Sequence, residues 1–498
     1  MHKSSLLEII RTFTPKEIIK FEDFVNSPYF NKNKNVIKLF AEVIKYRPEF
    51  NNENLEKELV WNKLFPEKNY NYGIMKNIIH DLNKLCESFL SEEIYNAKEN
   101  QKSNDFLESI IDRDLTDYFE NKYAAYEKAF KKNFEKKNIR STKDYYHQQK
   151  LLTERYEAFL HNYSPQKKDS IKIIPSCEYL IYTFLIDSFK MMHKVIGHSL
   201  QYNHPLNENI LYNHLKNLEE NNTIEMILKY TEAKPGNDHL ILKCYYSMFK
   251  ALFFNDDPDK FYEFKKNISV VTNILPKSEI RDLYFTSMTC LTNLKVTLNN
   301  FSSEYFDIIL LCYKSKVLLN KDGSISPHLF FSIVNMACSQ NELTFAENFI
   351  EEYSPKIPFD FRDAQFNYAM SGLFFKKGEF HKSLEYLSKI QNEEKSMKYY
   401  IKNRQITIYF ELNDRESFEY AFDSLKHYIR KNKLTNESRI LTLTKYCEYI
   451  KAMFKLREKY NSYDLDLLKN EIEKNKVSSK KWLLRKLEEI ESENKKNR

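Results

Sequence analysis

Glycine is the residue that most limits what this chain can fold into. Only 6 of its 498 residues are glycine, whereas glycine makes up about 7% of an average protein. Tight turns between strands often need a residue that tolerates a positive φ, and glycine does so most readily. A β-sandwich, a propeller or a doubly wound α/β domain of this length is therefore hard to build. Long helices joined by short polar connections are favoured.

The rest of the composition predicts a folded protein of the cytoplasm. Hydrophobic residues make up 42% of the chain and charged residues 30%, so a substantial core can form. The seven cysteines are widely spaced without a C-x-x-C pair, which favours reduced, buried thiols over disulfides or a zinc site. The N-terminus has no signal-peptide core, and the longest apolar run, residues 308–313, is far below the ~18 residues of a membrane span. We expect no contact with a membrane.

Residues 1–95 are predicted to form an N-terminal helical module. A helix start is predicted at Thr14, Pro15 and Glu17. The threonine side chain can cap the helix, and the side chain of the glutamate three residues later can accept a hydrogen bond from the threonine N–H. Apolar residues at helical spacing indicate three further helices, within residues 36–44, 55–65 and 74–90. We expect this module to cap the helices that follow.

Residues 55–90 also permit an alternative interpretation. A helix ending in Leu64-Phe65-Pro66, a polar turn and a long helix resemble the core of a winged-helix DNA-binding domain. The second helix would then enter the major groove and present five polar residues to bases and phosphates, namely Lys76, Asn77, His80, Asn83 and Lys84. A β-hairpin should follow that helix, whereas the sequence from Ser91 onward is polar and helical in character. A helical cap is therefore the favoured interpretation.

Residues 96–232 are predicted to form long helices with a basic bias. Lysines near residues 131–137 and Arg140 could follow a phosphate backbone. Four interleaved aromatic residues at helical spacing are more typical of a buried stripe, namely Tyr123, Tyr126, Phe130 and Phe134. We therefore expect the lysines to form a solvated face, and we place an internal break within residues 164–176.

Residues 233–450, which begin at the Pro235-Gly236 turn, carry a repeating frame. The turn residue Gly378 is followed five positions later by the small Ser383 and nine positions later by Leu387. The same frame fits from Asn341 and from Asn413. An apolar helix precedes each turn, so the pattern predicts pairs of helices. One such pair cannot bury its own apolar face, whereas stacked pairs share a continuous core.

This frame resembles the tetratricopeptide repeat. In that repeat a small residue stands where Ala346 and Ser383 fall, and a helix-ending proline stands where Pro358 falls; Phe418 departs from the pattern. The resemblance implies an all-α fold, a right-handed α-α superhelix. The amphipathic pattern near the C-terminus further predicts capping helices and a polar tail at 451–498. Four segments also resemble a group of Bacteroidota-type helical proteins that implies no activity, namely residues 24–31, 64–66, 409–412 and 481–484.

No motif predicts catalysis, a cofactor or a metal. Neither a G-x-G-x-x-G nor a phosphate-binding G-x-x-x-x-G-K-[ST] occurs, and no G-x-S-x-G is present. The histidines at 193, 198, 204 and 214 do not have the i, i+4 spacing of a helical metal pair. We therefore expect no catalytic, cofactor-binding or metal-binding residues.

These observations predict a non-enzymatic scaffold that binds an unidentified protein or peptide partner. The first alternative is a transcriptional regulator that contacts DNA through residues 55–90 and an effector through the repeats. The second alternative is an enzyme whose site is assembled between helical modules. The net charge of +7 is mild for a chain of this size and does not by itself indicate nucleic acid.

Overall fold

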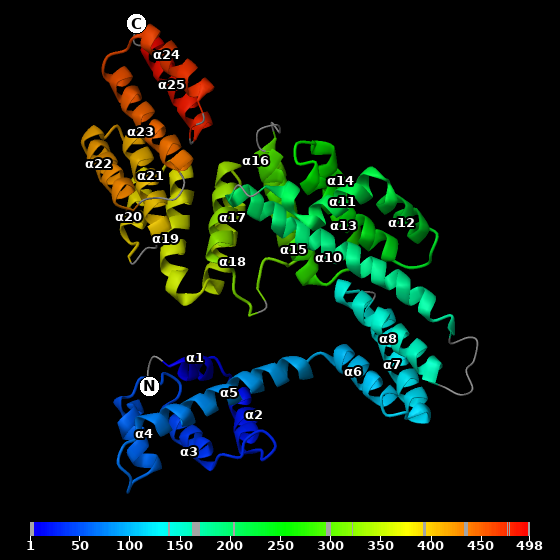
Figure 1. The fold of residues 1–498 in the computed structure, drawn as a ribbon. Helices are drawn as coiled ribbons and strands as arrows, with labels where there is room; N and C mark the ends of the chain where they lie inside the picture. Colours follow the sequence, from blue (N-terminus) through cyan, green and yellow to red (C-terminus); the bar gives the residue numbers. More distant parts are fainter. Residues whose placement is uncertain are drawn as a thin grey trace. The chain divides into compact units, whose positions relative to one another are not determined.

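The computed structural model describes residues 4–137, 140–161, 170–202, 205–294, 300–320, 322–391, 395–432, 437–475, 477 and 479–496. Every regular element within these ranges is a helix, and they contain no strand. The chain divides into two compact units, Met1–Leu185 and Ile186–Arg498 (Figure 1). The predicted all-α class is confirmed, whereas the domain boundaries after residues 95, 232 and 450 stay predictions.

The first unit is built from short helices followed by long ones. Its α-helices are α1 (Ser5–Arg11), α2 (Pro15–Asn26), α3 (Lys34–Val43), α4 (Lys57–Leu64), α5 (Tyr72–Asn96), α6 (Glu99–Ile111), α7 (Thr116–Lys137), α8 (Thr142–His161) and the first part of α10 (Ile173–Tyr202). The predicted capping box is present, because the Thr14 hydroxyl accepts from the Glu17 N–H and the Glu17 carboxylate accepts from the Thr14 N–H. Residues 164–169 of the predicted break lie outside the described residues.

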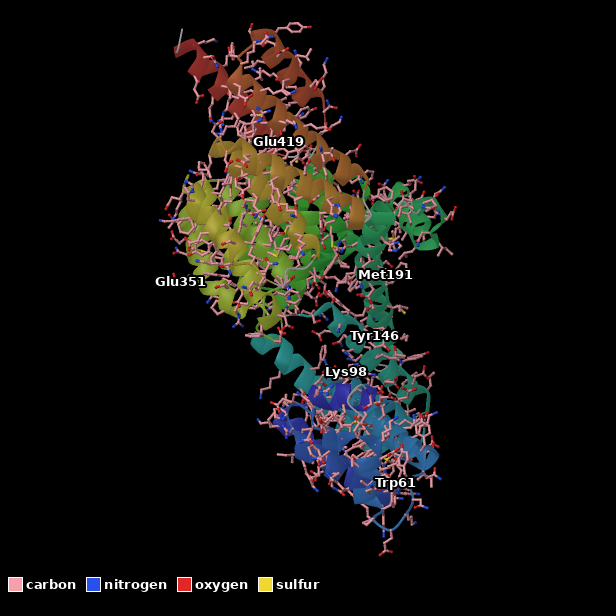
Figure 2. All side chains as sticks on the ribbon, turned by 90° about the vertical axis from the view of Figure 1, so that its left-hand side faces the viewer. Trp61, Lys98, Tyr146, Met191, Glu351 and Glu419 are labelled. Carbon is pink, nitrogen blue, oxygen red and sulfur yellow. The ribbon has the colours of Figure 1, made fainter. Side chains whose placement is uncertain are left out.

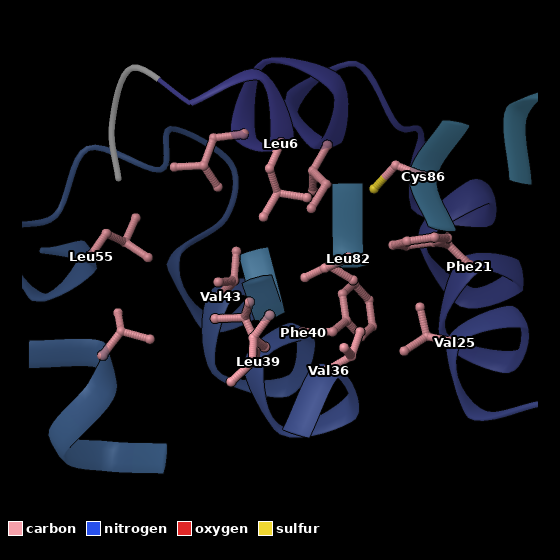
Figure 3. Close-up of a cluster of buried hydrophobic side chains, with 14 of the residues drawn as sticks. Leu6, Phe21, Val25, Val36, Leu39, Phe40, Val43, Leu55, Leu82 and Cys86 are labelled. Carbon is pink, nitrogen blue, oxygen red and sulfur yellow. The ribbon is translucent and has the colours of Figure 1, made fainter. Parts of the chain in front are cut away.

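Helices α1 to α5 close around one apolar core (Figure 3). Leu6, Phe21, Leu39 and Leu82 come from four different helices and are all fully buried. Each such side chain stabilises the fold by about 1.5–3 kcal/mol through its removal from water. The N-terminal segment therefore has an apolar core of its own.

Glu42 is a buried carboxylate that links α3 to α4. Its oxygens accept hydrogen bonds from Lys45 Nζ at 2.7 Å, from Lys63 Nζ at 2.9 Å and from Tyr46 Oη at 3.0 Å. Burial by itself would raise the pKa of Glu42, but these three donors favour the ionised form and lower that pKa to about 2. The cluster therefore stabilises the fold only while Glu42 is ionised.

We expect Glu42→Gln to destabilise the chain at neutral pH and to lose this effect in acid. A carboxylate whose pKa is lower in the folded chain contributes stability above its unfolded pKa of ~4.3 and loses it as the pH falls further. Thermal melts of wild type and variant should show a gap in Tm that narrows below about pH 5. Glu22→Gln, which removes an exposed carboxylate from α2, is the control. A gap that is independent of pH would contradict this role.

Helices α6, α7 and α8 pack around the aromatic stripe predicted for this region. Tyr123 is buried, and Tyr126 and Phe130 are half-buried; the side chain of Phe134 lies outside the described residues. Arg140 is buried, and its guanidinium lies 4.5 Å from the ring centroid of Tyr145. Arg140 is therefore part of the packed interior and does not contribute to a phosphate-binding surface.

The second unit continues from α10 through a long series of helices. They are α11 (Ile210–Glu220), α12 (Thr223–Glu232), α13 (Asp238–Phe253), α14 (Pro258–Val271), α15 (Lys277–Asn293), α16 (Phe301–Lys314), α17 (Pro327–Ser339), α18 (Leu343–Tyr353), α19 (Phe359–Lys376), α20 (Phe380–Ser388), α21 (Lys395–Glu411), α22 (Arg415–Asn432), α23 (Glu437–Glu458), α24 (Ser462–Lys474) and α25 (Lys480–Lys496). Helices adjacent in the chain pack as pairs, and α13 with α15, α17 with α19 and α21 with α23 are also in contact (Figure 1). None of the described helices is both long and apolar enough to span a membrane.

The same backbone turn follows α16, α17, α19 and α21, and in the first case its left-handed residue is Lys316. The other three turns join the helices that carry the predicted frame. The residue two positions after the end of α17, α19 or α21 has a left-handed φ, 63° at Asn341, 78° at Gly378 and 57° at Asn413. In each turn the next N–H donates to a carbonyl five residues earlier, at Ala337, Phe374 and Tyr409. This bond closes the end of a helix and satisfies a carbonyl that would otherwise lack a donor. The three left-handed residues are the ones that open the predicted frame.

Small residues let the paired helices approach closely. Ala346 and Ser383 are fully buried, and the Ser383 hydroxyl donates to the Ser371 carbonyl at 2.7 Å across α19 and α20. Phe418 occupies the third frame position and packs instead against Phe454, with ring centroids 5.0 Å apart. Pro358 differs from expectation, because α18 ends at Tyr353 and Pro358 is the N-cap of α19.

We expect Gly378→Ala to destabilise the second unit by about 1 kcal/mol, because the turn requires a left-handed φ that alanine adopts at a cost. Gly197→Ala in α10 is the matched control, since its new Cβ meets nothing within 4 Å and alanine favours a helix interior by ~1 kcal/mol. Thermal melts should therefore shift by about 2 °C in opposite directions. Equal shifts for the two variants would contradict the role of the turn.

Candidate functional site

Two pockets lie on α17, α19 and α21, the first helices of the three pairs, and the second pocket also extends to Tyr446 of α23 and to Ser479 and Trp482 at the start of α25. We call the first the apolar pocket; it has a volume of about 300 Å³ and is lined by Ser326, Pro327, His328, Phe331, Phe361, Gln365, Met397 and Tyr400. We call the second the basic pocket; it has a volume of about 270 Å³ and is lined by Asn335, Cys338, Ser339, Tyr368, Gly372, Phe375, Lys376, Asn403, Arg404, Thr407, Tyr446, Ser479 and Trp482.

The lining positions are equivalent on the three helices. Counting back thirteen residues from each left-handed turn residue gives His328, Gln365 and Tyr400, which all line the apolar pocket. Counting back six gives Asn335, Gly372 and Thr407, which all line the basic pocket. The shared turn therefore brings the same face of each helix to the same surface.

Arg404 is held in place within the basic pocket. Its guanidinium lies 3.8 Å from the ring centroid of Tyr368, and it donates to the Tyr368 carbonyl at 2.7 Å and to Asn335 Oδ1 at 3.1 Å. Gly372 leaves room for it, because a Cβ there would come within 3.0 Å of Arg404 Nη1. A guanidinium has five N–H donors, and those not used in these two bonds have no partner among the described residues.

Lys376 provides a second positive charge in the same pocket. It makes no ion pair or hydrogen bond with any described residue, and it remains accessible to solvent. The surrounding protein lowers the pKa of Lys376 by desolvation, an effect that Cys338 opposes and that Arg485 and Arg404 increase. No aspartate or glutamate lines either pocket. The positive charge therefore has no counter-charge within the lining.

Each pocket also contains a buried amide oxygen without a donor. These are Gln365 Oε1 in the apolar pocket and Asn403 Oδ1 in the basic pocket. A buried acceptor left without a donor costs about 1–3 kcal/mol. Such groups are therefore typical of places where a ligand or an ordered water completes the hydrogen bonding.

The second helices of the pairs carry acidic residues that lie outside both pockets. Figure 2 labels Glu351 on α18 and Glu419 on α22, and neither helix contributes to the two pockets. Glu351 is exposed, whereas Glu419 pairs with Lys451 at 2.8 Å. Glu351 and Glu419 therefore lie on helices other than those that line the two pockets.

A larger pocket of about 820 Å³ lies in the first unit, between α5, α6, α7 and α8. It is lined in part by His147, Asp105 and Tyr95, and the Tyr95 hydroxyl donates to Asp105 at 2.9 Å. Burial lowers the pKa of His147, and its ring makes no hydrogen bond with a described residue. A nucleophile activated by a base is typically joined to it by such a bond, and the structure shows none at His147 among the described residues.

The five predicted DNA-contacting residues lie on α5. Lys76, Asn77, His80 and Lys84 are exposed, while Asn83 accepts from the Ser5 hydroxyl of α1 at 3.2 Å and donates to Glu87. Residues 91–96 continue α5, and α6 begins at Glu99. The stretch that would form the hairpin of a winged helix is therefore helical, which favours the cap.

The structure shows no metal-binding group at the described histidines of residues 193–214. The His193 ring lies 3.2 Å from the Thr286 hydroxyl, and His204 lies outside the described residues. Among the residues that the structure describes, no group of three or more His, Cys, Asp or Glu side chains is placed to hold a metal ion. All seven cysteines are unpaired, and six of them are buried.

No protein family, curated protein or solved structure matches the chain. Its function must therefore be inferred from the described residues themselves. The feature of these residues that says most about function is the pair of pockets on α17, α19 and α21, because they combine accessible charge, apolar surface and unsatisfied amides.

We expect the full chain to give no salt-sensitive shift of duplex DNA near physiological ionic strength, because α5 and α6 leave no wing beside the exposed lysines. Electrophoretic mobility shifts with wild type and with a Lys76→Glu, Lys84→Glu double variant measure this. A shift that the double variant abolishes would instead support the DNA-binding alternative, since it would depend on charge from the face of α5.

Proposed function

We propose that this chain is a non-enzymatic scaffold that holds a segment of a partner protein in a groove on α17, α19 and α21. The helix pairs would stack as a right-handed solenoid similar to tetratricopeptide repeats. Three identical turns support this stacking, as do the contacts between α17 and α19 and between α21 and α23. Stacks of helix pairs expose one face of every first helix along a continuous surface.

The observation that carries the proposal is the alignment of the two pockets along the same three helices. At about 300 Å³ and 270 Å³, each lies at or below the lower end of the ~300–1,000 Å³ range of small-molecule sites. Such volumes suit single side chains better than an enclosed metabolite. Two neighbouring pockets of different chemistry are what a surface needs to recognise an extended segment, with apolar anchors giving affinity and polar contacts giving orientation.

Charge reversal on the two faces of the helix pairs tests this proposal. We expect Lys376→Glu to lose the partners that wild type captures from its native host, and Glu351→Lys on α18 to retain them, because only Lys376 lies in the groove. Quantitative mass spectrometry of the captured proteins gives the comparison. Cross-linking of a captured partner should map to α17, α19 or α21.

Circular dichroism of both variants controls for folding, since both residues are exposed. Equal loss of partners from both variants, or cross-links confined to the second helices, would place binding outside the groove and overturn the proposal.

A further inference from the structure

The positive charge of the groove and the distance between its two pockets together favour one class of peptide segment. We propose that the bound segment presents a carboxylate to Lys376 and Arg404 and, three residues away, an apolar side chain to the apolar pocket. This inference rests on the proposed function. The groove would thus recognise an acidic peptide motif. Four observations on the described residues lead to this motif. They are the positive charge of the basic pocket, the fixed position of the Arg404 guanidinium, the two amide oxygens without donors, and the distance between the pockets.

Charge complementarity decides the sign of the ligand. Lys376 and Arg404 line the basic pocket without a counter-charge in that lining, and Arg485 adds to the positive field at Lys376. Two like charges in partly desolvated surroundings are costly unless an anion joins them. A ligand carboxylate removes this cost, whereas a ligand ammonium would increase it.

The geometry of Arg404 favours a carboxylate. Stacking on Tyr368 and the bond to Asn335 fix the plane of the guanidinium before any ligand arrives. A fixed guanidinium with unused N–H groups matches the two oxygens of a carboxylate, and charge-assisted bonds of this type are about twice as strong as neutral ones. Lys376, as a mobile point charge, can then approach the same group.

The unsatisfied amides indicate that the anion belongs to a polypeptide. Gln365 Oε1 and Asn403 Oδ1 lack donors, one in each pocket. A free inorganic anion is too small to reach both pockets, so it cannot provide donors to both amides. An extended peptide carries one N–H and one C=O on nearly every residue, so it can satisfy either orientation of these amides.

The distance between the pockets sets the spacing of the motif. On each helix the two lining positions are seven residues apart, as in Gln365 and Gly372 of α19, which corresponds to ~10 Å at a rise of 1.5 Å per residue. A peptide in the polyproline II conformation returns to the same face every three residues after ~9 Å. A β-strand returns after ~7 Å or ~13 Å, so neither of its repeats matches as well.

Binding of designed peptides to the full chain tests this inference. The probes are fluorescein-labelled, C-terminally amidated nonapeptides of serine and proline that carry one leucine and one glutamate, with the spacing between the two varied from about one to about five residues. A matched series carries glutamine in place of glutamate. A third series has no glutamate and instead ends in a free carboxylate, so that a side-chain and a terminal carboxylate can be distinguished. Fluorescence anisotropy gives the dissociation constants.

We expect the tightest binding at a spacing of three, and about tenfold weaker binding when glutamate is replaced by glutamine, in keeping with the loss of a charge-assisted hydrogen bond. Lys376→Gln should weaken binding of the glutamate peptide about tenfold and leave the glutamine peptide unchanged. Lys376→Arg should retain binding. Lys377→Gln is the control, because Lys377 pairs with Glu347 on α18 at 3.2 Å and lies outside both pockets.

The outcomes separate this inference from the proposed function. Peptides that bind equally with glutamate and glutamine, or without regard to spacing, would overturn the acidic motif and leave a peptide-binding groove intact. Binding that is unchanged in Lys376→Gln would do the same. Failure of every peptide to bind would count against the groove itself and would overturn both.

Discussion

The backbone reversal at Asn341, Gly378 and Asn413 is the constraint on which the candidate site depends. Each turn ends a first helix with a left-handed residue and the same hydrogen bond to a carbonyl five residues earlier. Because an α-helix has 3.6 residues per turn, fixing its end fixes the direction of every side chain on it. Positions six, ten and thirteen residues before the turn then lie on one face. Three separate helices thereby contribute matching positions to one surface.

The side chains on this face of α17, α19 and α21 explain why the surface has pockets. The apolar residues of α17, α19 and α21 are used in packing against neighbouring helices, while the basic pocket is lined at several positions by small side chains, such as Ser339, Gly372 and Thr407. Arg404 occupies part of the space that these residues leave and stacks on Tyr368. The surface therefore combines a rigid charge with room for a ligand. Its amides, which would be satisfied in a closed core, remain without donors.

Local rules predicted the elements of this fold well. The shortage of glycine predicted helices, Thr14 predicted a helix start, and the frame at Gly378 predicted a turn whose φ is indeed left-handed. Pro358 shows where these local rules fail to decide. A proline is compatible both with the end of one helix and with the start of the next, and here it precedes α19. The contacts of α17 with α19 and of α21 with α23, by contrast, join residues that are far apart in the chain, and no local pattern specifies which of them meet.

The candidate site was missed from the sequence for a related reason. Lys376 lies in the last turn of a helix, where a lysine is commonplace because it complements the helix dipole. Arg404 and Tyr368 are far apart in the chain, and only the approach of α21 to α19 brings their side chains together. A signal was nevertheless present, since reading the frame backwards from each turn residue gives the lining positions. The predicted frame itself, from Gly378 to Ser383 and Leu387, covers only the turn and the second helix.

The seven thiols differ in exposure, so one of them is accessible to a reagent in the folded chain. Cys177 in α10 is exposed, whereas the other six cysteines are buried, and burial raises the pKa of Cys86, Cys290, Cys312 and Cys447 to about 12. Thiolates are the reactive species, and deeply buried thiols form them rarely. An alkylating dye or spin label added under native conditions should therefore attach at one known position without any cysteine having been removed. The protein is thus already suited to spectroscopic study of its movements in solution.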